Sequence, residues 1–362
     1  MGKQQKIFFD FLRVCIGSAK EIPSSLKDAD WKELYAIAKK QCLVGVLFDG
    51  IKKLPAEKVG MKKELLLQWM AESQLLEKAN VRLNDAAIHV SEWFQKKGFR
   101  TCILKGQGNA LMYPNPYSRT PGDIDIWVEG GDKRVISFVR SISPHEKACY
   151  HHIEFPSYKG IEVEVHYRPS FLLCFWHNRK LQKYYERVKE EQFSHRVMLG
   201  EQGEVAIPTA EFNLIFQLTH IFTHLMNEGI GLRQLVDYYY LISMLSVNCE
   251  MLTSLQKELK ELGLWKFAGA IMYIMHEVFG MPASRLIVPP NEKYGKFVLN
   301  EVLEAGNFGR HDARNRFGRS KLGHNLQRVY RDMRLVTYFP AEALCEPIFR
   351  VGHFFWRMKN KK

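Results

Sequence analysis

The amino-acid sequence predicts an α+β protein in which a small mixed α/β core is flanked by N- and C-terminal helical regions. Three observations support this expectation: helical periodicity over residues 1–98, short strand-like segments over 99–208, and renewed helical periodicity over 209–362. With 362 residues, the chain exceeds what one hydrophobic core usually serves. We therefore expect an N-terminal helical region, an α/β core and a C-terminal helical region with a basic tail, divided at these boundaries.

The N-terminal region has its clearest helical pattern between residues 63 and 97. Apolar side chains spaced by sevens, fours and threes share one face of the expected helix: Leu76, Leu83, Ala87, Val90 and Phe94. Gly98 supplies a C-terminal stop, and Pro23, Pro55 and Gly60 separate the earlier helices.

The core region is expected to alternate short strands with turns and helices. A strand over 99–104 leads into a glycine turn at 105–108, a helical patch at 109–113 and a proline-containing loop. The later elements are a half-buried strand at 123–128, a helix at 132–142 on the far side of the sheet, strands at 151–155 and 161–166 joined by a hairpin turn, a helix at 184–192 and a strand at 203–208.

Helical patterns resume after the core. Thr209 can cap the start of an amphipathic helix that reaches Met226, and a second helix is expected over 232–245. Gly229 and Gly231 separate the two.

The chain is basic, with 52 lysine and arginine residues against 39 aspartate and glutamate residues and a formal net charge of +13. Such an excess favours phosphate-bearing partners: nucleotides, nucleic acid or anionic membrane surfaces. Part of it lies in one C-terminal cluster: Arg310, Arg314, Arg316, Arg319, Lys321, Arg328, Arg331 and Arg334. That cluster is either a site for nucleic acid or a solvated basic face.

The expected compartment is the cytoplasm. Seven dispersed cysteines without a Cys-x-x-Cys pair favour buried thiols in a reducing environment over a disulfide framework. Asp10 and Arg13 interrupt the apolar N-terminus, which indicates an amphipathic helix rather than a signal peptide. No stretch approaches the ~20 uninterrupted apolar residues of a membrane span.

The candidate chemistry begins with two aspartates on one expected strand. Successive strand side chains point to opposite faces, so Asp123 and Asp125 share one face while Ile124 and Ile126 enter the core. Two carboxylates about 7 Å apart along a strand repel each other, and a divalent cation between them removes that cost.

The strand at 161–166 repeats this pattern, with Glu162, Glu164 and His166 on one face. If it pairs beside the first strand, a third carboxylate joins the two aspartates. Three carboxylates can hold two metal ions roughly 3.5–4 Å apart, which is the arrangement used for in-line phosphoryl transfer. Each of these acidic patterns, taken alone, is also common on a solvent-facing strand.

A glycine turn lies upstream of these carboxylates. The run Lys105-Gly106-Gln107-Gly108 ends a strand and precedes a helix start, so its backbone N–H groups and the helix dipole can bind a phosphate. Arg119 lies in the loop between this turn and the first aspartate.

These segments resemble the uncharacterised bacterial nucleotidyltransferase family of the polymerase-β superfamily. The resemblance rests on Leu104-Lys105-Gly106, on Arg119 to Val128 with its Asp-Ile-Asp, on Glu164-Val165-His166, on the helix with His220 and His224, and on Gly231 to Asp237. It implies a small mixed-sheet polymerase-β-like nucleotidyltransferase core.

The resemblance also implies roles for individual residues. Asp123, Asp125 and Glu164 are the implied catalytic metal ligands, with Glu164 preferred over Glu162 because it stands two residues before His166. The implied nucleotide- and phosphate-binding residues are Lys105, Gly106, Gln107, Gly108 and Arg119. The superfamily usually has Gly-Ser or Gly-Gly where this chain has Gly106-Gln107. The turn therefore lacks a serine hydroxyl for binding a phosphate, which puts its phosphate binding in question.

The implied activity is transfer of a nucleoside monophosphate from an NTP to an acceptor hydroxyl, with release of pyrophosphate. Two Mg²⁺ (or Mn²⁺) ions are the expected cofactors. The acceptor is a small molecule, a protein or an RNA. The alternative is a catalytically weak nucleotide- or nucleic-acid-binding regulatory protein with the same fold.

Other residues are expected to line the cleft: His166, His220, His224, Arg233 and Asp237. The four-residue spacing of His220 and His224 also suits zinc or a plain core position, and that of Arg233 and Asp237 suits an intrahelical ion pair. Which of His151 and His152 faces the site depends on strand register. No Gly-x-Ser-x-Gly or P-loop motif occurs.

Overall fold

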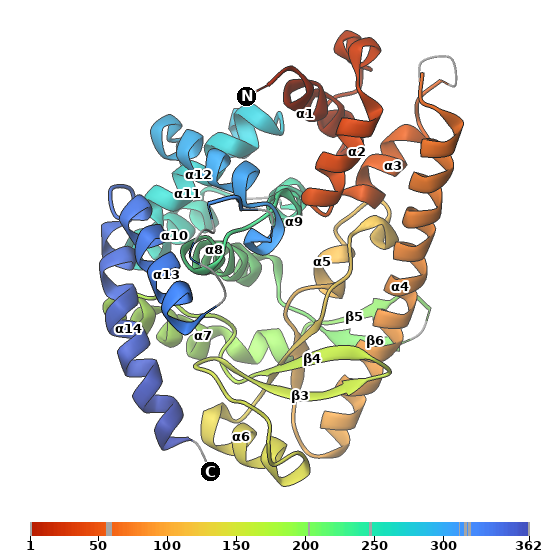
Figure 1. Cartoon of the computed structure of the whole chain (residues 1–362). Helices are drawn as coiled ribbons and strands as arrows, with labels where there is room; N and C mark the ends of the chain where they lie inside the picture. Colours follow the sequence, from red (N-terminus) through yellow and green to blue (C-terminus); the bar gives the residue numbers. More distant parts are fainter. Residues whose placement is uncertain are drawn as a thin grey trace.

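The computed structural model describes residues 2–55, 60–201, 203–245, 248–310, 312–314, 317 and 320–360. It has the expected α+β architecture: a small mixed sheet flanked by helices that precede and follow it in the chain (Figure 1).

The helices before the sheet are α1 (Lys3–Cys15), α2 (Trp31–Lys40), α3 (Val44–Ile51) and α4 (Lys63–Lys96), with the 3-10 turn η1 (Ser24–Asp28). The long helix expected at 63–97 is confirmed as α4. Its buried face includes Leu83, Ala87, Val90 and Phe94, all of which the sequence pattern places together. Helix α4 runs along one side of the molecule and reaches the sheet (Figure 1).

Four short strands form the main sheet, in the order β1-β2-β4-β3. Their bounds are β1 (Thr101–Ile103), β2 (Ile124–Val128), β3 (His152–Tyr158) and β4 (Ile161–His166). Strands β1 and β3 pair antiparallel with their neighbours, whereas β2 and β4 pair in parallel. The expected pairing of the Asp-Ile-Asp strand with the Glu-Val-Glu strand is therefore present.

The hairpin between β3 and β4 turns more tightly than expected. Lys159 and Gly160 both have positive φ, of 51° and 79°, so the turn itself takes two residues. Pro156 lies inside β3, where the register between Phe155 and Tyr158 is irregular and tolerates a residue without an N–H group.

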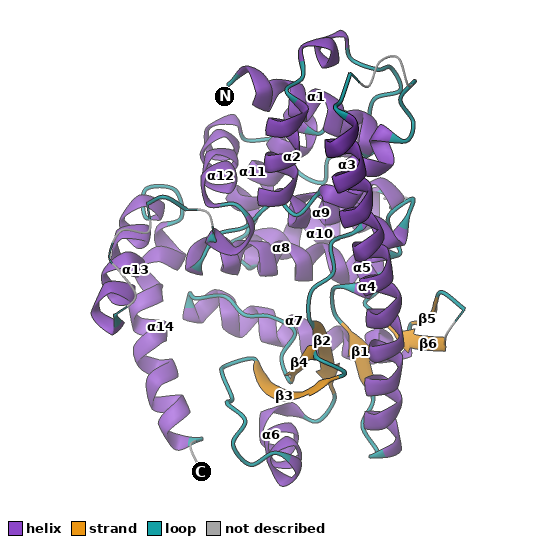
Figure 2. Cartoon of the chain, turned by 45° about the vertical axis from the view of Figure 1, so that its right-hand side comes forward, coloured by secondary structure: helices purple, strands orange, loops and turns teal. Residues whose placement is uncertain are grey.

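The two faces of the sheet are covered by different helices. Ile124, Ile126 and Val128 pack with α4 and with α6 (Gly131–Ile142) in one hydrophobic cluster. On the other face, Trp127 packs against Phe193 of α7 (Phe175–Ser194). Figure 2 shows α6 and α7 on opposite sides of the strands. The expectation of a half-buried strand at 123–128 is wrong, because helices cover both faces and every residue of β2 is buried.

Two elements of the core differ from the sequence expectation. Helix α7 begins at Phe175, nine residues before the expected start at Tyr184. A strand that the sequence did not suggest, β5 (Arg196–Leu199), pairs with β6 (Gly203–Ala206) in a separate two-stranded sheet. The small helix α5 (Gln107–Ala110) and the 3-10 turn η3 (Pro116–Ser118) connect β1 to β2.

The remaining helices pack above and beside the sheet. They are α8 (Ala210–Asn227), α9 (Leu232–Met244), α10 (Cys249–Glu261), α11 (Trp265–Tyr273) followed by the π-helical turn η4 (Ile274–Val278), the 3-10 turn η5 (Ala283–Arg285), α12 (Glu292–Ala305), the 3-10 turn η6 (Asn307–Gly309), α13 (Lys321–Leu335) and α14 (Pro340–Lys359). Thr209 caps α8 as expected, because its hydroxyl accepts a hydrogen bond from the Phe212 amide.

Three of the seven cysteines match the expectation of buried thiols. All seven cysteines are free, and Cys15, Cys102 and Cys174 are buried, although Cys249 is exposed. Within the part of the chain that the structure describes, none of the helices combines the length and the apolar character needed to cross a bilayer.

Candidate functional site

A cleft of about 690 Å³ lies between the sheet and helices α8 and α9. It is lined by most of the residues that the sequence singled out: Lys105, Gly106, Arg119, Asp123, Asp125, Glu164, His166, His220, His224, Arg233 and Asp237. Gln107 and Gly108 are not among its lining residues.

Three carboxylates meet at the sheet side of the cleft. The parallel register places Asp125 of β2 beside Glu164 of β4, and Asp123 immediately precedes β2. One oxygen from each lies within 4.8 Å of the other two. Hard oxygen donors at this spacing fit a divalent cation such as Mg²⁺. Glu162, the rejected alternative, also lines the cleft but lies outside this group.

Charge in this carboxylate group is unevenly distributed. Repulsion by Asp125, with burial, raises the pKa of Asp123 to about 6. Burial also opposes ionisation of Asp125, but the nearby Lys105 and His166 outweigh it and lower the pKa of that carboxyl. Nearby protein cations therefore keep Asp125 ionised, whereas Asp123 titrates close to neutral pH.

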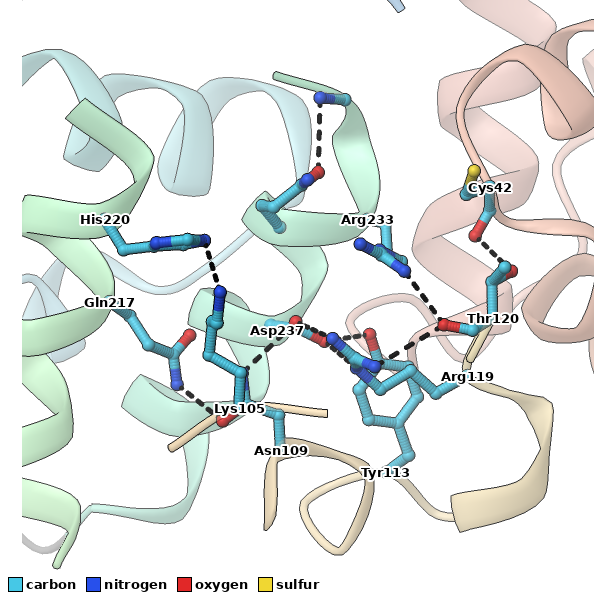
Figure 3. Close-up of polar contacts among 12 residues, drawn as sticks. Cys42, Lys105, Asn109, Tyr113, Arg119, Thr120, Gln217, His220, Arg233 and Asp237 are labelled. Carbon is cyan, nitrogen blue, oxygen red and sulfur yellow. Dashed lines mark hydrogen bonds and ion pairs between the residues drawn. The ribbon is translucent and has the colours of Figure 1, made fainter. Parts of the chain in front are cut away.

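Lys105 is the cation at the centre of the site. It follows β1, and the main-chain N–H of Leu104 donates to the Asp125 carbonyl, which holds the two segments together. Lys105 Nζ lies 2.8 Å from Asp125 Oδ1. It also lies 3.4 Å from His220 Nε2, and Figure 3 shows this second contact. Burial disfavours its charge, but Asp125 and Asp123 raise its pKa above the usual value.

His166 lies between two of the carboxylates. Its Nε2 is 3.0 Å from Asp125 Oδ1 and 3.4 Å from Glu164 Oε2. Burial lowers the pKa of this imidazole, but contacts with Asp125 and Glu164 outweigh burial and raise it to about 9.

The sequence left open which of the two adjacent histidines, His151 or His152, faces the site. Both His151 and His152 line the cleft. His152 pairs with His166 across the strands, and its Nδ1 lies 3.3 Å from Glu164 Oε2. Burial, with the proximity of His166, lowers the pKa of His152 to about 4.

The glycine turn presents its backbone to the cleft and its glutamine to the protein interior. Gly106 has φ +55° and ψ −105°, a conformation that only glycine adopts readily. The Gln107 side chain is buried, and its amide donates to Asn84 and to the Asn80 carbonyl on α4. A Cβ at Gly108 would meet Ile207 at 3.2 Å. The turn is therefore held in place by its contacts with the protein interior.

Arg119 and Asp237 form a buried ion pair at the α9 side of the cleft. The guanidinium donates to both carboxylate oxygens at 2.8 Å, and the Tyr113 hydroxyl donates to the same carboxylate at 2.6 Å (Figure 3). Arg233 instead donates to the Thr120 carbonyl at 3.0 Å. The expected intrahelical pair between Arg233 and Asp237 is therefore wrong: a bidentate partner from another segment takes the carboxylate.

The two histidines of α8 have separate partners. His220 contacts Lys105, and His224 Nδ1 lies 2.6 Å from Glu228 Oε1. Neither belongs to a group of three metal-ligating side chains among the described residues, so a zinc site at this pair has no support. Burial, together with Lys105, lowers the pKa of His220 well below its usual value.

Sequence reasoning missed several cleft residues: Asn109, Gln217, Glu228 and Phe308. Asn109 links the small helix α5 to the larger helices, because its Oδ1 accepts from Gln217 at 3.1 Å and its amide donates to Asp237 at 3.3 Å. The only sequence signal of Asn109 and Gln217 was polar character within buried helices, which does not indicate a ligand by itself.

The described members of the C-terminal basic cluster do not form one open surface. Arg310 lines the cleft. Arg314 and Arg334 both pair with Glu301, and Arg331 is buried. Arg328 is exposed, whereas Arg316, Arg319 and the side chain of Lys321 lie outside the described residues.

Comparisons with known proteins identify a family that matches most of the chain. A family described as uncharacterised nucleotidyltransferases matches residues 27–280, which include the sheet and every residue of the cleft except Phe308 and Arg310. A search of curated proteins found no match. Among solved structures, an antigenic nucleotidyltransferase-like protein from Paracoccidioides brasiliensis is similar at 15% identity, over 50% of this chain and 86% of that chain. The TM-score between the two structures is 0.30.

Proposed function

Because the chain belongs to this family of uncharacterised nucleotidyltransferases, we propose that it transfers a nucleoside monophosphate from an NTP to an acceptor hydroxyl and releases pyrophosphate. The observation that carries this proposal is the parallel register of Asp125 with Glu164, which brings both carboxylates together with Asp123 at the sheet side of the cleft.

Asp123, Asp125 and Glu164 are the residues that would hold the divalent cations, because they offer only oxygen donors and converge on one point. When bound, such cations neutralise the triphosphate and lower the pKa of an attacking hydroxyl.

The protein's own cations have different tasks in this proposal. Lys105 lies beside the carboxylates, and Arg233 and Arg310 line the same cleft, so these three offset charge on the phosphates. Two guanidinium nitrogens of Arg119 donate to Asp237, and the third donates to the Thr120 carbonyl. We therefore assign Arg119 to positioning the loop before β2 rather than to binding phosphate directly.

The glycine turn contributes backbone rather than side chain. Gly106 lines the cleft and its conformation brings the chain close to the Asp123 carbonyl, while Gln107 points away. Turn N–H groups can therefore approach a phosphate without a serine hydroxyl. In this arrangement, the departure from Gly-Ser costs a side-chain contact but leaves the backbone approach intact.

The test is incubation of the full chain with each labelled NTP and Mg²⁺ in the presence of cell extract. We expect one acceptor to carry the label, and Asp123→Asn and Asp125→Asn to abolish transfer while the far-ultraviolet circular dichroism stays unchanged. Glu154→Gln is the matched control, since Glu154 faces Glu164 across the strands yet is exposed and outside the carboxylate group. Full transfer by either aspartate variant would refute the assignment.

A result with tight Mg²⁺-NTP binding and no labelled product would favour the regulatory alternative. Retained binding that weakens steeply with salt, together with RNA capture, would indicate phosphate-backbone recognition.

A further inference from the structure

Two imidazoles lie beside Glu164. The antiparallel register of β3 and β4 places His152 directly opposite His166. His152 Nδ1 lies 3.3 Å from Glu164 Oε2, and His166 Nε2 lies 3.4 Å from the same oxygen. One donor atom from each of the three side chains lies within 4.8 Å of the others.

These separations match the edges of a metal coordination shell. Ligands bound at about 2.1 Å and at right angles around one ion are about 3 Å apart. His166 Nε2 is also 3.0 Å from Asp125 Oδ1, so the same imidazole adjoins a ligand of the all-oxygen group. A cation here would share Glu164 with the first position.

The orientation of His166 supplies an independent observation. Its Nδ1 lies 3.4 Å from the main-chain carbonyl of Arg168, the partner of an imidazole N–H. Metal-ligating histidines usually donate their second ring N–H to a carbonyl or carboxylate, which leaves the other nitrogen free to bind. In this arrangement, that other nitrogen faces Asp125 and Glu164, and a cation bound there would replace the proton that these two carboxylates favour.

We propose that His152, Glu164 and His166 form a second cation position with two nitrogen ligands, which takes Mn²⁺, Co²⁺ or Zn²⁺ in preference to Mg²⁺. Imidazole suits these transition metals, whereas Mg²⁺ selects oxygen ligands. As a refinement of the two-metal site the inference rests on the proposed function, but cation binding itself can be measured without turnover.

The experiment uses the purified full chain with Mn²⁺ alone as the probe. Pulsed electron paramagnetic resonance detects ¹⁴N nuclei of imidazoles bound to Mn²⁺, and equilibrium titration gives the affinity. We expect ¹⁴N coupling in the native protein, and weaker coupling with about tenfold lower affinity in His152→Gln. His195→Gln is the matched control, because His195 is exposed and contacts the Ile207 carbonyl outside the cleft.

A neighbouring group of possible ligands shares His152 with Cys149 and His151, so a third variant separates the two. Cys149→Ser should leave Mn²⁺ affinity and ¹⁴N coupling unchanged. Loss of affinity in Cys149→Ser would place the cation in that neighbouring group and overturn the proposal, as would Mn²⁺ bound without ¹⁴N coupling, failure to bind Mn²⁺, or native coupling in His152→Gln.

Measurement of NTP consumption on the same samples keeps the two proposals apart. Nitrogen-coupled Mn²⁺ without any nucleotidyl transfer would contradict the enzymatic proposal alone. Transfer with Mg²⁺ and no nitrogen coupling would contradict the second cation position alone. Because His152 lies at the start of β3, thermal unfolding of each variant verifies that the strand pairing survives.

Discussion

The guanidinium of Arg119 and the carboxylate of Asp237 meet in a bidentate ion pair, with both hydrogen bonds at 2.8 Å and both side chains about 5% exposed or less. Arg119 ends the turn before β2, and Asp237 lies in the middle of α9. The pair therefore connects the loop that leads into the aspartates with the helical region (Figure 3).

Asp237→Asn should destabilise the protein by about 3 kcal/mol or more, because it leaves the buried guanidinium of Arg119 without its counter-charge. The measurement is urea unfolding followed by circular dichroism. The double variant Arg119→Met/Asp237→Leu should lose less than the sum of the single changes. Lys296→Met, which removes an exposed pair with Glu292, should leave the unfolding midpoint unchanged. A double variant whose loss of stability equals the sum of the single losses would contradict direct coupling between Arg119 and Asp237.

The same pair predicts a pH dependence of stability. Burial opposes ionisation of Asp237, but Arg119 outweighs it and lowers the pKa of Asp237 below the unfolded value of about 3.9. A depressed carboxyl pKa stabilises the fold above the unfolded value, and this contribution is lost as the pH falls through the folded value. The difference in unfolding free energy between the native protein and Asp237→Asn should be constant above about pH 5 and shrink below about pH 4. A constant difference down to pH 3 would argue against it.

Lys105→Met should affect cation binding and nucleotide binding in opposite directions. Its ammonium lies 2.8 Å from Asp125, so its removal strengthens the attraction of the carboxylates for Mn²⁺ and weakens that for phosphate. We expect roughly tenfold tighter Mn²⁺ binding and a roughly tenfold higher KM for NTP, about 1.4 kcal/mol each. Titration and steady-state kinetics measure the two effects, with the exposed Lys133→Met as the control. Weaker Mn²⁺ binding in Lys105→Met would show that the Lys105 ammonium does not repel the bound cation.

Gln107→Ala should lower stability without changing nucleotide affinity. The buried amide of Gln107 anchors the glycine turn to Asn84 and to the Asn80 carbonyl, and its loss costs about 1–2 kcal/mol. The side chain does not line the cleft, so the KM for NTP should stay within about twofold of the native value. A large rise in KM with unchanged stability would show that Gln107 contacts substrate.

The strand elements of the site were predictable because their sequence signal is local. Alternation around Asp123 and Asp125 places both on one face, and the same period selects Glu164 and His166. The parallel register that sets Asp125 beside Glu164 was not predictable, since it depends on the long connection through α6 and β3.

Tertiary contacts overrode local rules elsewhere. The four-residue spacing of Arg233 and Asp237 favours a pair along α9, yet Arg119 offers a bidentate geometry that an intrahelical partner cannot match. Likewise, Gln107 stands where a phosphate contact was expected, but burial against α4 turns it inward. The short β5 escaped notice because it has four residues, of which the last three, Val197, Met198 and Leu199, are all apolar and show no alternation.

Strands β2 and β4 are the two interior strands of the four-stranded sheet, so each is flanked by a paired neighbour on both sides. Fraying begins at sheet edges, which in this fold belong to β1 and β3. The backbone amides beneath Asp125 and Glu164 should consequently exchange with deuterium only when the whole sheet opens, so the spacing of these two carboxylates persists for as long as the native fold itself.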